Sequence, residues 1–409
     1  MTTMAAMAKV AETPPGGTFQ NEAAEALLGL QGALRELLDR LPFPIRTAAD
    51  LRHGLSLDPR LPWRVFKVAT ARDPLAVGHL VPGPAAMRRF LAAAGQHGAP
   101  TDRVKAVQAA HERFERVIAA HAGERSAFAS MISSVGGMPA TDELLRQRRT
   151  AFRANSAIYG MRTRTVVQCL IHRPSTAGGW MDVAALYRHH HLHFLRPRPF
   201  GLGSKSSGAT KGTESFEPFD RESFERHGAP MIPEFCSQPM PPFQTSDEGL
   251  LVVSSDEIGI GNRSAVDLAF GWVQRKEWRP HDDPDRCFRT GFSLTAPAEV
   301  LLIDVLAPAG MFDAQTIPPV VQYNCTFARR ARDRHPQDRL DLTETATHLG
   351  TGISAAHTLD APRHTEFLQH VCDRLGWDSR SFDVFRCRVE YPLLKTFIDM
   401  TLNLAAPAK

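Results

Sequence analysis

The hydrophobic period of the chain changes near Thr163, and this change most constrains the fold. Before it, apolar residues recur at helical steps of three and four, within segments that begin at caps such as Asn21 and Thr141. From Thr163, β-branched and partly alternating segments are separated by Pro-, Gly- and Asp-rich connections, as in strands. The sequence therefore predicts an α+β fold, with an all-helical N-terminal domain and a β-rich α+β C-terminal domain built on an antiparallel sheet.

A chain of 409 residues is too long for one ordinary core, so we expect more than one domain. The composition of residues 1–20 predicts a disordered tail. A helical domain is expected over 21–140, a connecting helix over 141–160 and the α+β domain over 161–409. Within this last domain, the Gly, Ser, Thr and Lys residues of 201–213 predict a flexible loop.

Several segments of the C-terminal half carry the expected elements. One strong helix is predicted, with Asp360 as its cap, Pro362 in its first turn and Gly376 as its stop. The expected strands are 163–172, 250–254, 268–273, 300–306, 320–327 and 382–391.

Positive charge is concentrated in one part of the N-terminal domain. The whole chain carries a formal net charge of +4. Between Arg40 and Arg89 there are nine Lys or Arg residues and three Asp residues, a local excess of +6. A local basic field attracts phosphate groups, although an arginine-rich solvated surface would have the same composition.

The segment between Thr47 and Thr70 predicts two helices joined by a tight turn. The first helix would span 48–55 with Thr47 as its cap, and Ser56 and Leu57 would form the turn. Asp58 and Pro59 would open the second helix. At about 100° per residue, its side chains divide into sectors. The basic sector contains Arg60, Arg64 and Lys67, the apolar stripe contains Leu61, Val65 and Val68, and Trp63 and Phe66 are expected against neighbouring helices.

The segment over residues 47–70 resembles the helix-turn-helix domains of bacterial transcriptional regulators. The matching residues are AADLRHGLSLDPRLPWRVF. Two positions depart from that pattern, because Arg52 replaces a small residue and Ser56 replaces the usual glycine of the turn. The resemblance implies double-stranded DNA as a partner. Five residues are the expected DNA contacts: Arg46, Arg60, Arg64, Lys67 and Arg72. A two-helix corner in an ordinary helical domain is the alternative interpretation.

A helix predicted over 101–121 carries a heptad-like seam. Its members recur at steps of 3, 4, 3, 4 and 3: Val104, Val107, His111, Phe114, Ile118 and His121. The seam fits a dimer interface, but packing against the protein's own core is the favoured interpretation, because it is shorter than the three to four heptads of a secure coiled coil.

The segment YRHHHLHFLRPRP suggests a possible metal site. On a regular strand, His189, His191 and His193 would point to one face, and three imidazoles can bind zinc or another transition metal. Flanking Arg196 and Arg198 would repel a cation, so a basic patch is the preferred interpretation. Asp256 and Glu257 could serve as an acid/base pair.

Together these observations predict a cytoplasmic DNA-binding transcriptional regulator without a cofactor. The C-terminal domain would sense a small-molecule effector or form a homodimer.

We expect no transmembrane helix, because no run of about 18 apolar residues occurs. The six cysteines form no C-x-x-C pair, which favours reduced, buried thiols. The alternatives are an enzyme with a β-rich catalytic domain, metal-dependent through the histidine cluster, and a non-catalytic self-assembling protein.

Overall fold

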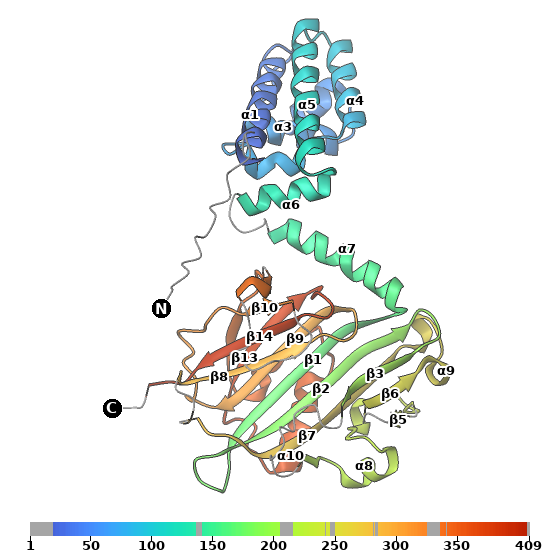
Figure 1. Cartoon of the computed structure of the whole chain (residues 1–409), viewed down its shortest axis with the longest axis vertical. Coiled ribbons are helices and arrows are strands. Elements are labelled where there is room, and N and C mark those ends of the chain that lie inside the picture. Colours follow the sequence, from blue (N-terminus) through green and yellow to red (C-terminus); the bar gives the residue numbers. More distant parts are fainter. Residues whose placement is uncertain are drawn as a thin grey trace, which may run out of the picture. The chain divides into compact units, whose positions relative to one another are not determined.

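The computed structural model describes residues 19–135, 141–204, 216–241, 243–245, 250–280, 282, 285–324, 336–340 and 342–406. The chain divides into two compact units, Met1–Ala140 and Thr141–Lys409. The first unit is helical, and the second contains three sheets and a few helices (Figure 1). The α+β class predicted from the sequence is confirmed.

The first unit consists of short helices whose ends follow local capping rules. Thr47 forms a capping box with Asp50 at the start of α2, and Pro84 occupies the first turn of α4. The helices and the one 3-10 segment of the described part are α1 (Phe19–Leu38), α2 (Ala48–Leu55), α3 (Arg60–Thr70), η1 (Leu75–Leu80), α4 (Pro84–Gln96), α5 (Thr101–His121) and α6 (Arg125–Val135).

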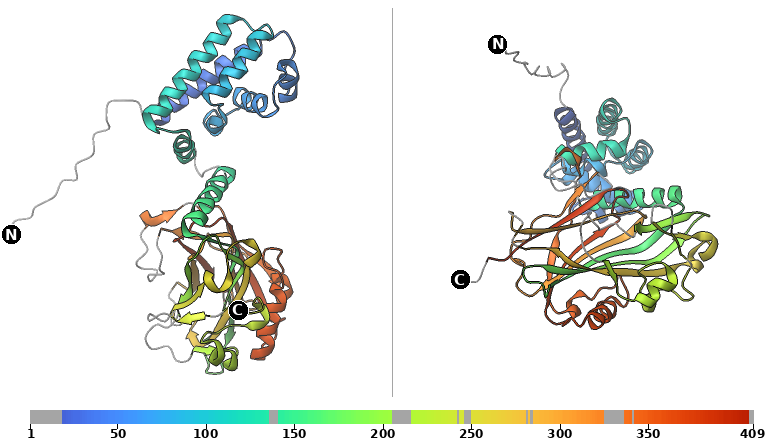
Figure 2. Two further views of the ribbon diagram at one scale, coloured as in Figure 1. Left: turned by 90° about the vertical axis from the view of Figure 1, so that its right-hand side faces the viewer. Right: turned by 60° about the horizontal axis from the view of Figure 1, so that its bottom comes forward.

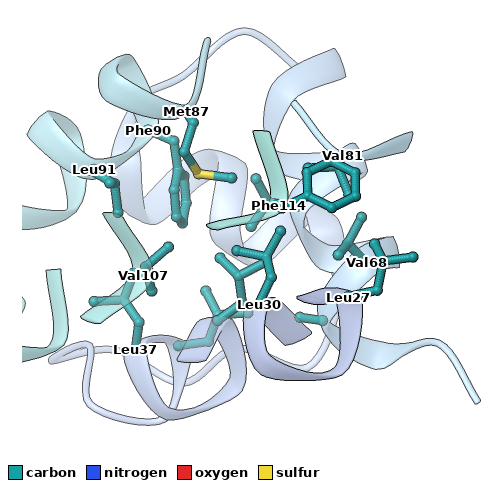
Figure 3. Close-up of a cluster of buried hydrophobic side chains, with 14 of the residues drawn as sticks. Leu27, Leu30, Leu37, Val68, Val81, Met87, Phe90, Leu91, Val107 and Phe114 are labelled. Carbon is teal, nitrogen blue, oxygen red and sulfur yellow. The ribbon is translucent and has the colours of Figure 1, made fainter. Parts of the chain in front are cut away.

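One apolar core fills the first unit. It joins Leu27 and Leu30 of α1 to Phe90 of α4 and Phe114 of α5, and all four side chains are buried (Figure 3). The heptad-like seam lies in this core, because α5 packs against α1 and buries Val107, His111, Phe114 and Ile118. At its end, His121 pairs with Glu22 of α1 at 2.9 Å. The seam is therefore internal to the unit and is not available as a dimer interface.

A seven-stranded sheet organises the second unit, with the strand order β12-β13-β9-β1-β2-β7-β4. Every neighbouring pair is antiparallel, as expected, except β1 and β9, which are parallel, so the sheet is mixed. Its strands are β1 (Met161–Pro174), β2 (Met181–Phe194), β4 (Phe216–Pro218), β7 (Val266–Trp278), β9 (Ala298–Pro308), β12 (Ala346–Thr351) and β13 (Phe382–Glu390).

Two smaller sheets and four α-helices complete the described part of this unit, together with the 3-10 segments η2 (Pro233–Phe235), η3 (Asn262–Ser264), η5 (Pro336–Asp338) and η6 (Ile353–Ala356). The four-stranded sheet has the order β11-β10-β14-β8, and the three-stranded sheet has the order β3-β6-β5. Their strands are β3 (Pro199–Ser204), β5 (Phe243–Thr245), β6 (Leu250–Ser254), β8 (Cys287–Ser293), β10 (Val321–Tyr323), β11 (Arg339–Leu340) and β14 (Phe397–Asn403). The helices are α7 (Thr141–Tyr159), α8 (Arg221–His227), α9 (Ser255–Ile258) and α10 (His364–Leu375).

The large sheet is covered on both faces. Helix α10 lies against one face (Figure 2). Its Phe367, Leu368 and Val371 belong to the apolar cluster on that face. On the other face, Ile398 and Met400 of β14 pack in a second cluster, and residues of β3 and β6 pack in a third. Because both faces are apolar, the central strands read as nearly continuous hydrophobic runs in the sequence.

Three boundaries differ from the sequence-based expectations. Gly201–Ser204 belong to β3, and the rest of the predicted 201–213 loop lies outside the described residues. Helix α10 begins at His364 with Arg363 at its N-cap position, so Asp360 does not cap it. The Asp360 carboxylate instead accepts hydrogen bonds from Arg388 at 2.7 and 3.0 Å. Helix α7, expected as a connection, belongs to the second unit, where Arg148 donates to Glu344 at 3.0 Å.

A buried charged network joins β9, β13 and α10. Asp304 is fully buried, and its carboxylate accepts two hydrogen bonds of 2.7 Å from Arg386. His364 Nε2 lies 2.8 Å from the same carboxylate. Although burial opposes ionisation, hydrogen bonds from Arg386 and His364 hold the pKa of Asp304 below its usual value. The network ties the first turn of α10 to the centre of the large sheet.

Among the described residues, no helix combines the length and hydropathy needed to cross a bilayer. Five cysteines are described, and all five are free thiols: Cys169, Cys236, Cys287, Cys372 and Cys387.

Candidate nucleic-acid interface

Helices α2 and α3 form the predicted two-helix element in the first unit. Thr47 Oγ1 accepts a hydrogen bond from Asp50 N, and the Asp50 carboxylate accepts from Thr47 N at 2.8 Å, which fixes the start of α2. Ser56 ends this helix with a left-handed backbone at φ 52°. The turn therefore has the conformation that usually selects glycine, although serine occupies it. Asp58 Oδ1 accepts a hydrogen bond from Arg60 N at 3.1 Å. Helix α3 begins at Arg60, one residue later than expected.

One face of α3 is exposed and basic. Its members recur at steps of 3, 4 and 3, so they lie within a sector of about 80°. We call this the α3 outer face, and it comprises Arg60, Trp63, Lys67 and Thr70. Helix α3 contains no acidic residue. The opposite face is anchored in the core through Leu61, Val65 and Val68. A helix that reads DNA needs one face buried in the protein core and a second, basic face that is exposed.

Trp63 was expected against neighbouring helices, and that expectation is wrong. Its side chain is 45% exposed, because it lies between Arg60 and Lys67 on the α3 outer face. The same 3, 4, 3 spacing was present in the sequence. An aromatic ring in this position offers apolar contact area beside two cations.

Arg64 occupies a different place from the one its predicted role requires. Its Nε donates to Leu80 O at 2.8 Å and its Nη2 donates to Val81 O at 3.0 Å. The side chain is half-buried between α3 and the segment that follows η1. The expectation that Arg64 points freely toward DNA is therefore wrong, because its guanidinium binds the protein's own backbone.

The C-terminal end of α3 is held by α1. Gln31 Nε2 donates to Val68 O at 3.0 Å and to Ala71 O at 2.8 Å, and Arg35 donates to Ala69 O and Ala71 O. These donors satisfy carbonyl groups that a helix end leaves without intrahelical partners. The contacts fix where α3 ends relative to α1. Of the other expected DNA contacts, Arg46 lies just before α2 and Arg72 just after α3, and both are exposed.

The histidine segment does not form the predicted three-imidazole face. A bulge interrupts the pairing of β2 with β7 between His189 and Leu192, and His191 adopts φ 56°. The extra residue reverses the alternation. His189 therefore packs against Phe200 and Phe270 of one cluster, whereas the His191 and His193 rings lie together, 5.5 Å apart.

Some ring nitrogen atoms of the segment bind other protein groups, whereas the buried Nδ1 atoms of His189 and His193 have no hydrogen-bond partner in the described part of the chain. Arg162 Nε donates to His193 Nε2 at 2.8 Å, and His190 Nδ1 lies 2.9 Å from Asp267 Oδ1. Burial lowers the pKa of His189 to about 4. No group of three or more His, Cys, Asp or Glu side chains with metal-binding geometry occurs among the described residues. The geometry of the described residues therefore gives no support to zinc binding at His189, His191 and His193, the less favoured interpretation of this segment.

The suggested acid/base pair lies on the four-residue helix α9. Asp256 is exposed there, and the side chain of Glu257 lies outside the described residues.

Comparisons with known proteins add little to this geometry. No family model matches the chain, and no curated protein matches it. A solved structure from Parabacteroides distasonis, described as a "putative protease", matches with a TM-score of 0.23 and 9% sequence identity. The match covers 61% of this chain and spans 41% of that one. A similarity of this size carries no argument about fold or activity.

Proposed function

We propose that the first unit binds double-stranded DNA through the α3 outer face, as part of a cytoplasmic transcriptional regulator. The observation that carries the proposal is the exposed stripe of Arg60, Trp63, Lys67 and Thr70 on a helix without acidic residues. Cationic side chains on a rigid helix suit the phosphates that flank the major groove, and the spacing leaves the Trp63 ring between them.

The mechanism begins with electrostatic attraction. Exposed Arg60 and Lys67 would neutralise phosphates and release counterions, with Arg46 and Arg72 at either side of the two-helix element. The α3 outer face would then enter the groove, where Trp63 and Thr70 offer apolar and hydroxyl contacts to base edges. The capped α2 and the hydrogen bonds from α1 support this step, because a helix already held in place loses little entropy on docking.

A salt series tests the proposal. Binding of the full chain to random-sequence duplex DNA is measured by fluorescence anisotropy at several salt concentrations. The variant Arg60→Ala/Lys67→Ala should bind more weakly, and its log–log salt slope should be smaller by about 2, since each phosphate contact contributes about 0.9 to the slope.

A matched control uses Lys105→Ala/Arg116→Ala, which removes the same charge from exposed positions of α5. This variant should keep the wild-type salt slope. Equal slope changes in both variants would reduce the effect to net charge, and the absence of binding at low salt would refute the proposed function.

A further inference from the structure

Three consecutive carbonyl groups, at the last residue of η1 and the two residues after it, receive cationic or imidazole side chains from three different helices. Arg64 of α3 donates to Leu80 O and Val81 O. Arg125 of α6 donates to Val81 O at 2.7 Å and to Pro82 O at 3.1 Å. His111 Nε2 of α5 lies 2.8 Å from Pro82 O. We call Leu80, Val81 and Pro82 the carbonyl segment.

Burial explains why these donors are needed. Val81 and Pro82 are buried and lie between η1 and α4, outside any helix or strand. Buried backbone carbonyls without a partner are costly, so side chains must supply the missing donors. Arginine suits this role because its planar fork can bind two acceptors at once and it retains its charge.

We infer that Arg64 is a positioning residue that orients α3 and does not contact DNA. Its Nε and Nη2 atoms engage backbone acceptors 16 and 17 residues further along the chain. Because Gln31 and Arg35 hold the C-terminal end of α3, Arg64 supplies a second fixed point near the middle of the helix. Two separated points fix the rotation of α3 about its axis, and hence the direction of the α3 outer face.

The carbonyl segment also couples α6 to α3. Val81 O is shared by Arg64 and Arg125, so a change at Arg125 alters the acceptor on which Arg64 depends. Arg125 further pairs with Glu115 of α5, which places its guanidinium within one polar cluster. The orientation of α3 therefore depends on a residue of α6 that lies about 60 positions further along the chain.

This inference rests on the proposed function for its DNA-binding test, but its second test needs no DNA. In the first, Arg64→Lys and Lys67→Ala are compared in the salt series. Arg64→Lys keeps the charge but cannot bind both carbonyls, so we expect about tenfold weaker DNA binding with an unchanged salt slope, as for the loss of one charge-assisted hydrogen bond. Lys67→Ala should lower the slope by about 0.9.

In the second test, amide hydrogen exchange of α3 is followed by mass spectrometry on the free protein. Arg64→Lys and Arg125→Gln should each speed exchange in α3 by about tenfold, again the effect of one lost charge-assisted bond, whereas Lys67→Ala should leave it unchanged. Circular dichroism checks that each variant is folded. Should Arg125→Gln not fold, Arg64→Lys alone decides the exchange test.

Wild-type affinity of Arg64→Lys together with unchanged exchange in α3 would overturn the inference, because a phosphate contact tolerates lysine. If neither the wild type nor any variant binds DNA, the proposed function fails. The hydrogen-exchange result then still decides whether Arg64 and Arg125 position α3.

Discussion

Replacing Asp304 by Asn should strongly destabilise the second unit. The substitution leaves the Arg386 guanidinium buried without its charged partner and places an amide where His364 and Arg386 both need an acceptor. Removal of one partner from a buried ion pair typically costs about 3–5 kcal/mol. Because Arg386 still donates to Ala356 O at 2.7 Å and His357 O at 3.3 Å, we expect a loss near the lower end, about 3 kcal/mol.

Tryptophan fluorescence during urea unfolding can measure this loss. Four of the five tryptophans lie in the second unit, so a Trp63→Phe background makes the signal specific for that unit. Linear extrapolation then gives the free energy of unfolding. The control is Asp378→Asn, which changes an exposed carboxylate paired with Arg380 and should have no measurable effect.

A double-mutant cycle and a pH series test the reasoning further. Asp304→Leu combined with Arg386→Met should lower the free energy of unfolding by much less than the sum of the single changes, because no unpaired charge is left.

The folded-state pKa of Asp304 is lowered, so its contribution to stability is complete above the unfolded pKa of about 3.9 and decreases as the pH falls through the folded value. The advantage of wild type over Asp304→Asn should therefore shrink below about pH 4. A loss under about 1 kcal/mol, or additive single changes, would refute the assigned role of the network.

Three further outcomes follow from local geometry. Thr47→Ala removes the capping hydrogen bond to Asp50 N and should lower the stability of the first unit by about 1 kcal/mol in urea unfolding followed by circular dichroism. Ser56→Gly should raise it by about 0.5–1 kcal/mol, because φ 52° strains any residue with a Cβ, whereas an equal gain from Ser56→Ala would contradict that explanation. Equimolar zinc should leave the melting temperature unchanged, since the histidine segment is split between two faces, and stoichiometric zinc that is lost in His191→Ala would show otherwise.

The helices were predictable because their signals are local. The helix expected over 101–121 has these bounds in the structure, and the helix expected over 141–160 spans Thr141–Tyr159. A cap and its helix lie within one turn of each other, so the sequence contains both. The strands were located less completely, since eight of them were not assigned from periodicity: β2, β3, β4, β5, β8, β11, β12 and β14.

The details of both candidate sites depend on partners distant in sequence. The role of Arg64 follows from carbonyls after η1, and the separation of His189 from His191 follows from a bulge opposite β7. Neither the bulge nor the carbonyl partners have a local sequence signal. By contrast, the exposure of Trp63 followed from the helical spacing itself, and the aromatic side chain was assigned to the core only because large apolar residues are usually buried there.

Strand β1 lies between β2, which follows it at once, and β9, which begins at residue 298. While a ribosome synthesises the chain, β1 and β2 can pair early, but the other edge of β1 has no partner until β9 has emerged. The strand with this unpaired edge contains apolar residues that are buried in the folded protein, such as Val167 and Ile171. Its edge can therefore pair with a strand of another nascent chain. The first unit, with its local helical contacts, can fold before this stage, and the yield of intact protein should depend on how fast synthesis proceeds from β2 to β9.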